Sequence, residues 1–195
     1  ADQYDWFYRP GVAAGIIPTN DGQACVWSGT SADRFMGGLH RDLERSFDLL
    51  LAEAAPQAVD RVRAAPRASR LRGFRGVPGF LRQPAGPGWA LIGDASHFKD
   101  PISAHGMTDA LRDADFLAEA VDAVLGGSSG EREALAGYRQ VRDRLTLDLF
   151  DAADEVAAYG WDLGHLRGLL LTLSKAMKEE VEALAELDER PASAA

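Results

Sequence analysis

The first thirty residues carry short runs of β-branched and aromatic side chains interrupted by glycine and proline, a pattern typical of strands. It predicts three strands, at residues 5–10, 12–18 and 23–30. Asn20-Asp21-Gly22 is a strong hairpin signal between the second and third, because these residue types tolerate the backbone angles of tight turns. Three aromatic side chains either pack across these strands or line a cavity, and the sequence supports both interpretations: Trp6, Tyr8 and Trp27.

Helical spacing replaces this pattern from residue 41 onward. Residues 41–54 place Leu43, Phe47, Leu50 and Leu51 on one face, which predicts an amphipathic helix. Pro56 then opens a shorter helix over residues 57–64, since proline fits the first helical turn. Residues 68–74 predict a return to strand, and QPAGPG at residues 83–88 predicts an irregular connection.

The rest of the chain is predicted to be mainly helical after one short strand, Trp89 to Ile92. A loop then leads into an amphipathic helix that ends near Leu125, where GGSSG at residues 126–130 breaks it. Ser128 and Glu131 have the spacing of a capping box for the next helix, and a last helix follows Asp162. Lys178-Glu179-Glu180 is predicted to face solvent. The predicted inward positions of these two helices are Leu135, Tyr138, Leu145, Leu149, Val156, Tyr159, Leu166, Leu170, Leu173, Met177, Val181 and Leu184.

The composition is ordinary for a globular protein and argues against some classes. A net charge of −9 argues against a general nucleic-acid binder. No apolar run approaches the ~20 residues of a membrane span. Cys25 is the single cysteine, so the chain cannot form an internal disulfide. This observation and the lack of a recognisable leader predict a cytoplasmic protein. The strand pattern around Cys25 predicts a small buried side chain. The arginine-rich segment 61–75 is predicted to be a solvated face paired with acids, with a site for an anion such as a nucleotide phosphate as the alternative.

The segment 88–118, GWALIGDASHFKDPISAHGMTDALRDADFLA, carries the clearest candidate chemistry. Asp94 follows the short predicted strand and Gly106 opens the helix, and such junctions bind ligands in α/β sheets. A helix N-terminus presents unpaired N–H groups and a partial positive charge, so it favours an anionic group. Gly106 has no side chain, which would let a flat ring approach closely.

This pattern resembles the second FAD-binding motif of the flavin-dependent aromatic hydroxylase superfamily, the class A flavoprotein monooxygenases. The matching positions are Gly93, Asp94, Ala95, His97, Pro101, Gly106, Ala110, Asp113, Ala114, Leu117 and Ala118. Two positions depart from it, since Ser96 stands where Ala is usual and Ala104 where a first Gly is usual. The resemblance implies that Asp94 accepts a hydrogen bond from a ribityl hydroxyl of FAD, and that Gly106 and Met107 lie beneath the isoalloxazine. The cofactor-binding residues it implies are Gly93, Asp94, Pro101, Ala104, His105, Gly106 and Met107.

The resemblance also implies a mixed α+β or α/β fold made of parts of two domains. Residues 1–83 would be the C-terminal part of the substrate domain, with an antiparallel sheet. Residues 84–126 would be the second half of the FAD-binding domain, and residues 127–195 a C-terminal helical region. The GxGxxG unit that holds the ADP half of FAD in these enzymes is not found in the sequence. The sequence is therefore predicted to be the C-terminal half of a longer enzyme, partnered by its N-terminal half or by a second copy.

The activity implied by the resemblance is that of an FAD-dependent monooxygenase. NAD(P)H would reduce the flavin, and oxygen would then form a C4a-hydroperoxide that hydroxylates or epoxidises a small organic substrate. A reductase of the same superfamily is an alternative, as is a halogenase, although the Trp-x-Trp-x-Pro signature is not found. Two alternatives come from other classes: a cofactor-free binding or assembly module, and an anion-binding module built on residues 61–75.

Few residues offer chemistry of their own, and no catalytic residue is assigned. His105 either lies near the flavin, where its charge would favour the reduced form, or faces solvent. His97 is predicted to form structural hydrogen bonds. Asp100 is predicted to pair with Lys99 or to position substrate or water. No metal site is predicted, because the spacing of His97 and His105 is not typical of a ligand pair.

Overall fold

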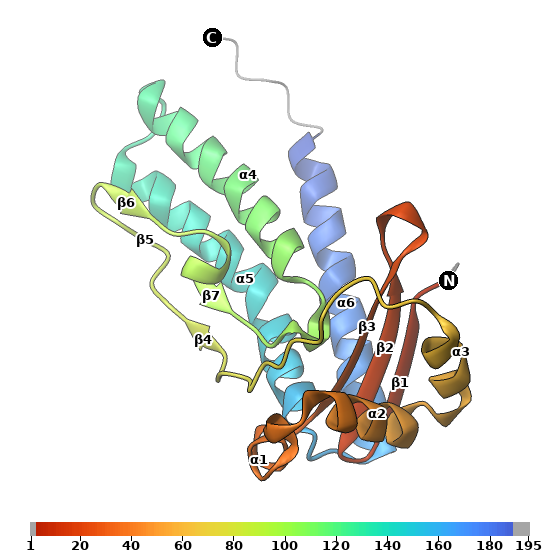
Figure 1. Cartoon of the computed structure of the whole chain (residues 1–195). Helices are drawn as coiled ribbons and strands as arrows, with labels where there is room; N and C mark the ends of the chain where they lie inside the picture. The colour runs from red at the N-terminus through yellow and green to blue at the C-terminus, as the bar shows by residue number, and fades with distance from the viewer. Residues whose placement is uncertain (1–2, 189–195) are drawn as a thin grey trace. The chain divides into compact units, whose positions relative to one another are not determined.

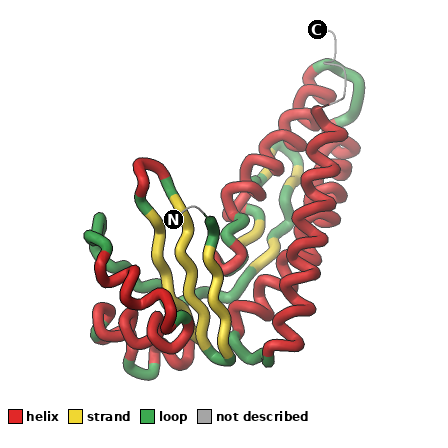
Figure 2. Tube along the Cα trace, turned by 90° about the vertical axis from the view of Figure 1, so that its right-hand side faces the viewer, coloured by secondary structure: helices red, strands yellow, loops and turns green. Residues whose placement is uncertain are grey.

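The structure is a computed structural model that describes residues 3–188. The chain forms two compact units. The first unit comprises residues 1–77 with 155–166, and the second comprises residues 78–154 with 167–195. Figure 1 labels the elements, and Figure 2 separates helix, strand and loop by colour. Helices and antiparallel strands occur together in the chain, which confirms the predicted mixed fold.

The first unit is built on a three-stranded antiparallel sheet in the order β1-β2-β3. The strands are β1 (Asp5–Arg9), β2 (Val12–Pro18) and β3 (Ala24–Thr30), which confirms the three predicted strands to within one residue at each end. The predicted hairpin turn is a 3-10 helix, η1 (Asn20–Gly22), in which Asp21 and Gly22 both adopt positive φ.

One face of this sheet forms an apolar core with α2 (Leu43–Ala54). Val12, Ala14 and Ile16 alternate along β2 and pack with a set of buried residues from α2 and the residues after it: Leu50, Leu51, Ala54, Ala55 and Ala58. The strand period of two and the helix period of 3.6 each place their apolar residues on one side, so the two faces meet. The amphipathic helix predicted over residues 41–54 is confirmed.

The other face of the sheet carries aromatic side chains. Trp6 lies edge-on to Trp27 with 5.5 Å between ring centroids, and Tyr8 lies edge-on to Trp161 at 6.1 Å. Residue 15 must be glycine beneath the Trp27 ring, because a Cβ there would lie 2.3 Å from Nε1 of Trp27. These rings therefore pack across the strands, as one of the two interpretations predicted.

Short helices complete the first unit: α1 (Ala32–Met36), η2 (Leu39–Arg41), η3 (Pro56–Ala58) and α3 (Val59–Ala64). Pro56 opens η3 as predicted. The strand predicted over residues 68–74 is wrong, because residues 65–79 have no regular secondary structure and pair with no strand. Its alternating arginines imitate a strand pattern, but the segment lacks a neighbouring strand to supply backbone partners. Cys25 is exposed, so the predicted burial of its side chain is also wrong: the residue lies near the start of β3, where the burial pattern is open.

Four short strands form two pairs in the second unit. Strand β4 (Phe80–Leu81) pairs with β7 (His97–Phe98), and β5 (Ala85–Gly86) pairs with β6 (Trp89–Ala90). The strand predicted from Trp89 to Ile92 is therefore shorter than expected, and the predicted irregular connection contains its hairpin partner. Two 3-10 helices follow, η4 (Gly93–Ala95) and η5 (Pro101–Ser103).

Three long helices supply most of the second unit, and Figure 1 shows them as long coiled ribbons: α4 (Gly106–Leu125), α5 (Glu131–Ala158) and α6 (Leu163–Asp188). The predicted end of α4 and start of α6 are confirmed. The capping box is wrong, because the Ser128 hydroxyl donates to the Ala123 carbonyl while the Glu131 carboxylate accepts from the Gly88 N–H.

The inward face predicted for α6 is displaced by one residue at four of its six positions. Its buried positions are Leu166, Leu169, Leu173, Ala176, Glu180 and Ala183, whereas Val181 is 65% exposed. Glu180 was predicted to face solvent and is instead buried, on the stripe that helical spacing defines. No helix among the described residues combines the length and the apolar character needed to cross a membrane.

Candidate functional site

The candidate site begins at the turn that contains Gly93 and Asp94. Gly93 has a φ of +51°, and a Cβ there would lie 2.8 Å from the Cβ of Ala110 on α4. Its N–H donates to Oδ2 of the buried Asp113 at 3.1 Å. A residue larger than glycine would therefore push the turn away from α4, and Asp113 fixes the turn in place.

The same geometry brings Asp94 to the start of α4. A Cβ built at Gly106 would lie 3.8 Å from Oδ1 of Asp94, in ordinary van der Waals contact, so the exposed carboxylate lies beside the first residue of the helix. No side chain caps this end of α4, and Met107 is 83% exposed. The first turn of α4 therefore keeps its partial positive charge facing open space, next to a carboxylate.

The loop before α4 explains two features of the sequence motif. Pro101 occupies the first turn of η5, and the Asp100 carboxylate accepts from the Ile102 N–H at 3.0 Å. Asp100 therefore caps this short helix rather than pairing with Lys99, and burial raises the pKa of its carboxyl group. Ala104 then adopts the left-handed conformation, with a φ of +51°. Glycine adopts this conformation without strain, whereas alanine disfavours it.

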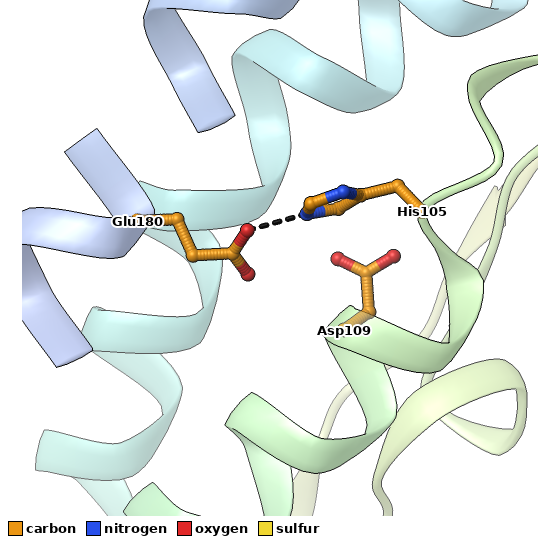
Figure 3. Close-up of side chains that lie close together, drawn as sticks. All are labelled: His105, Asp109 and Glu180. Atoms are coloured by element: carbon orange, nitrogen blue, oxygen red, sulfur yellow. Dashed lines mark hydrogen bonds and ion pairs between the residues drawn. The ribbon is translucent and has the colours of Figure 1, made fainter. Parts of the chain in front are cut away.

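His105 is buried in the second unit and does not face solvent. It is the N-cap residue of α4, and its Nε2 contacts a carboxylate oxygen of Glu180 on α6, as Figure 3 shows with a dashed line. The side chains of His105 and Glu180 are 11% and 2% exposed. The second carboxylate oxygen of Glu180 accepts from Nη1 of Arg112 at 2.8 Å.

Arg112 is the centre of a buried network of charges. Its guanidinium lies 2.8 Å from the Asp113 carboxylate and 3.1 Å from the Asp109 carboxylate, and Nη2 donates to the Thr146 hydroxyl at 3.0 Å. The network therefore joins α4 to α5 and α6, and through Asp113 it reaches the Gly93 turn. A guanidinium suits this position because it offers five donors in a rigid plane.

His97 on β7 and Lys99 just after it complete the network. The Lys99 ammonium contacts Asp109, while the His97 ring nitrogens lie 3.6 Å from Asp109 and 3.7 Å from Asp113. Those two distances are too long for hydrogen bonds, so the predicted hydrogen-bonding role of His97 is not realised. Burial raises the pKa of Asp109, but the neighbouring His97, Lys99 and Arg112 outweigh it and leave that pKa well below its usual range. Burial lowers the pKa of Lys99 despite its contact with Asp109.

Three of these residues could in principle hold a metal ion. The side chains of His105, Asp109 and Glu180 each offer one ligand atom, and these atoms lie within 4.8 Å of one another (Figure 3). However, Lys99 and Arg112 already lie against the same two carboxylates. A metal ion would meet two fixed positive charges there, so the arrangement favours internal ion pairs.

The face of α4 opposite this network is apolar and uncovered. Met107 is 83% exposed, Leu111 70%, Val121 43% and Leu125 82%. Ala114 and Ala118 lie between them at helical spacing, and neither is buried. We call Met107, Leu111, Ala114, Ala118, Val121 and Leu125 the α4 stripe. Since Asp109, Arg112 and Asp113 are buried on the other side, the first half of α4 has its charged face inward and its apolar face outward.

The arginine-rich segment forms surface ion pairs in the first unit. Arg61 pairs with Asp5, Arg63 with Asp48 and Arg67 with Glu44, as the predicted solvated face requires. The pairs are exposed and therefore weak. A shallow hollow beside α2 is lined in part by Arg41, Arg67 and Arg70.

Sequence reasoning missed the charged network and its two central residues, Arg112 and Glu180. Helical spacing carried a usable signal for Glu180, because the position falls three and four residues from the buried Ala183 and Ala176. Nothing in the sequence indicated that Arg112 and Glu180, 68 residues apart, would meet.

Comparison with known proteins establishes the fold of the chain. No protein-family model matches the sequence, and no curated protein matches it either. Among solved structures, PqsL, a probable FAD-dependent monooxygenase from Pseudomonas aeruginosa, is similar with a TM-score of 0.61 and 21% identity. A variant of PqsL gives the same values, and PqsL in complex with 2-aminobenzoylacetate gives a TM-score of 0.57. The match covers 82% of this chain and 46% of PqsL, so the chain spans less than half the length of that protein and has the fold of one part of it.

Proposed function

We propose that this chain supplies the part of an FAD-dependent oxidoreductase that holds the flavin ring and the ribityl chain. The observation that carries the proposal is the position of the Asp94 carboxylate beside the open start of α4 at Gly106. The residues proposed to surround the flavin are Gly93, Asp94, Pro101, Ala104, His105, Gly106 and Met107. The PqsL-like fold supports the same assignment.

The donors and acceptors at this site suit a flavin. Asp94 would accept a hydrogen bond from a ribityl hydroxyl, and the N–H groups of the first turn of α4 would donate to the pyrimidine edge of the ring. Gly106 leaves room for a flat ring because it has no side chain. When bound, FAD would supply the redox chemistry, and the protein would orient it and tune its electrostatics.

We further propose that the whole enzyme is a monooxygenase that takes electrons from NAD(P)H and acts on a small organic molecule. The likeness to PqsL, and the small organic ligand in one PqsL structure, support this choice. Residues 1–83 would then contribute to a substrate domain, residues 84–126 to the FAD domain and residues 127–195 to a helical region. A reductase of the same superfamily is the second candidate, because the proposed flavin contacts would serve either reaction.

The α4 stripe supports a partner for this part of the molecule. An apolar helix face of this length is normally covered in a working protein. PqsL contains more than twice the length that this chain matches. We propose that the cover is a nucleotide-binding half that holds the ADP moiety of FAD. A second copy of this chain is the alternative occupant.

The flavin content of the protein expressed from the complete reading frame that contains this sequence tests the proposal. We expect absorption maxima at ~370 and ~450 nm, typical of a bound flavin. We expect Asp94→Ala to lower the ratio of flavin to protein. Asp115→Ala serves as the matched control, because Asp115 is an exposed acid on α4 with no proposed flavin contact. A colourless protein that does not bind added FAD would overturn the proposal and leave a cofactor-free binding module.

A further inference from the structure

The start of α4 is held from a distant part of the chain. His105 caps α4 with its backbone, while its side chain reaches Glu180 on α6, which is 75 residues away in the sequence. Figure 3 shows that the imidazole and the Glu180 carboxylate point toward each other, from the green loop that leads into α4 and from the blue helix. Both side chains are at least 89% buried, since they are 11% and 2% exposed.

This contact acts on a strained part of the backbone. Ala104, immediately before His105, adopts a left-handed conformation that alanine disfavours. The Asp109 N–H donates to the His105 carbonyl at 3.0 Å, which closes the first hydrogen-bonded turn of α4. The His105 side chain thus joins the Ala104 turn to the packed interior, and its orientation depends on Glu180.

Glu180 is in turn fixed from its other side. Arg112 binds its second oxygen and also contacts Asp113, which accepts the Gly93 N–H. The carboxylate of Glu180 therefore has one fixed orientation, and the same network positions both the Gly93-Asp94 turn and the first turn of α4. Since the network is buried, water does not replace its contacts.

We propose that Glu180 is a positioning residue for the flavin site, acting through His105. It sets the direction of the Gly106 and Met107 N–H groups, and with them the contact to the pyrimidine edge of the flavin. The charge-assisted contact between His105 and Glu180 makes the setting directional, whereas apolar packing would leave the turn free to rotate. This inference rests on the proposed function in its reference to flavin, but the coupling of α6 to the turn is a property of the chain alone.

Amide hydrogen exchange measured by NMR on the 195-residue chain tests the coupling without any cofactor. In Glu180→Ala we expect exchange of the Asp109 amide to speed up about tenfold or more, the factor for loss of one hydrogen bond to a charged group. We expect chemical-shift changes at Ala104 to Met107 as well. Glu180→Gln keeps the shape and an acceptor oxygen, so it should restore part of the protection. His105→Gln tests the same contact from the other side.

Thr146→Val is the matched control, because it removes a buried hydrogen bond to Arg112 without touching His105. We expect it to leave the Ala104 to Met107 resonances nearly unchanged. Wild-type protection of the Asp109 amide in a folded Glu180→Ala variant, or in His105→Gln if Glu180→Ala does not fold, would overturn the inference.

The second readout is the Kd for FAD of the same variants, made in the protein from the complete reading frame. We expect Glu180→Ala to weaken binding and Glu180→Gln to recover part of the loss. If the amides at the turn are perturbed but the Kd for FAD is unchanged, Glu180 is coupled to the turn but does not position it for flavin binding. If the wild-type protein binds no FAD, the proposed function fails, and the amide measurement still decides whether Glu180 sets the turn.

Discussion

The core between β2 and α2 in the first unit and the region beneath the candidate site in the second unit bury different chemistry. In the first unit, β2 and α2 enclose aliphatic residues such as Val12, Ile16 and Leu51, all less than 5% exposed. In the second unit, the residues beneath the candidate site are charged, with Arg112, Asp113 and Glu180 no more than 1% exposed. An aliphatic core is stabilised by burial of area and has little directional preference, whereas a buried ion network stabilises only one arrangement.

This difference indicates where the orientation of side chains and backbone groups matters in the molecule. The sheet of the first unit needs only to be held together, and aliphatic packing does that. The turn at Gly93 and the start of α4 must present particular groups at particular angles, and directional contacts from Asp113 and Glu180 reach both. The cost is a network that tolerates little change, because removal of one charge leaves another buried without a partner.

Removal of Arg112 should lower the stability of the protein the most. Arg112→Leu leaves Asp109, Asp113 and Glu180 without their shared guanidinium, and we expect the free energy of unfolding to fall by about 3–5 kcal/mol. Urea unfolding followed by circular dichroism measures the change. Arg34→Ala, which removes an exposed pair with Glu53, is the control and should cost less than about 1 kcal/mol. Equal effects of the two variants would contradict the central role of Arg112.

Truncation in the aliphatic core should have the next largest effect. Leu51 is 1% exposed, and we expect Leu51→Ala to cost about 2–5 kcal/mol through the lost burial and the cavity left behind. Leu49→Ala, on the 49% exposed neighbour, should be much milder. The measurement is again urea unfolding, and a similar cost for both variants would show that α2 does not pack on the sheet as described.

Low pH should weaken the charged network in the second unit but leave the aliphatic core of the first unit unaffected. The pKa of Asp109 is lowered in the folded state, so its ionised form adds stability above the ordinary Asp pKa of about 4, and this stability is lost as the pH falls below that value. We therefore expect the difference in unfolding free energy between wild type and Asp109→Asn to shrink below about pH 4. The difference between wild type and Leu51→Ala should stay nearly constant over the same range. A constant difference for Asp109→Asn would contradict the stabilising ion pairs.

The smallest effect is expected at Cys25. Because its side chain is exposed, Cys25→Ser should change the unfolding free energy by less than about 0.5 kcal/mol. The native thiol should also react with a water-soluble reagent such as DTNB at a rate close to that of the unfolded chain. Slow labelling would indicate that the Cys25 side chain is buried, as its strand pattern predicts.

Sequence patterns over a few residues predicted the helices and strands whose formation depends mainly on neighbouring residues. The three strands of the first unit, α2, and the ends of α4 follow from periodicity, turn residues and glycine breaks. The motif also pointed to Asp94 and Gly106 as candidate site residues, and the two lie close together in the structure. The strand predicted over residues 68–74 is wrong because no neighbouring strand pairs with the backbone of this segment.

The charged network could not be predicted in the same way. A charged residue on a helix is normally solvated, and burial of Glu180 becomes favourable only because Arg112 and His105 come to it from other parts of the chain. Such long-range pairs leave no periodic trace in a single sequence. The one local sign was the place of Glu180 on the buried stripe of α6.

The central claim is that the start of α4 beside Asp94 receives the flavin ring. An FAD titration of the isotope-labelled protein expressed from the complete reading frame that contains this sequence, followed at individual amides by NMR, tests it most directly. The account predicts the largest shifts at Gly106, Met107 and Asp94, and their loss in Asp94→Ala. Shifts confined to residues 61–75 would indicate an anion site in the arginine-rich segment, and the absence of shifts at any amide would contradict a flavin site in this chain.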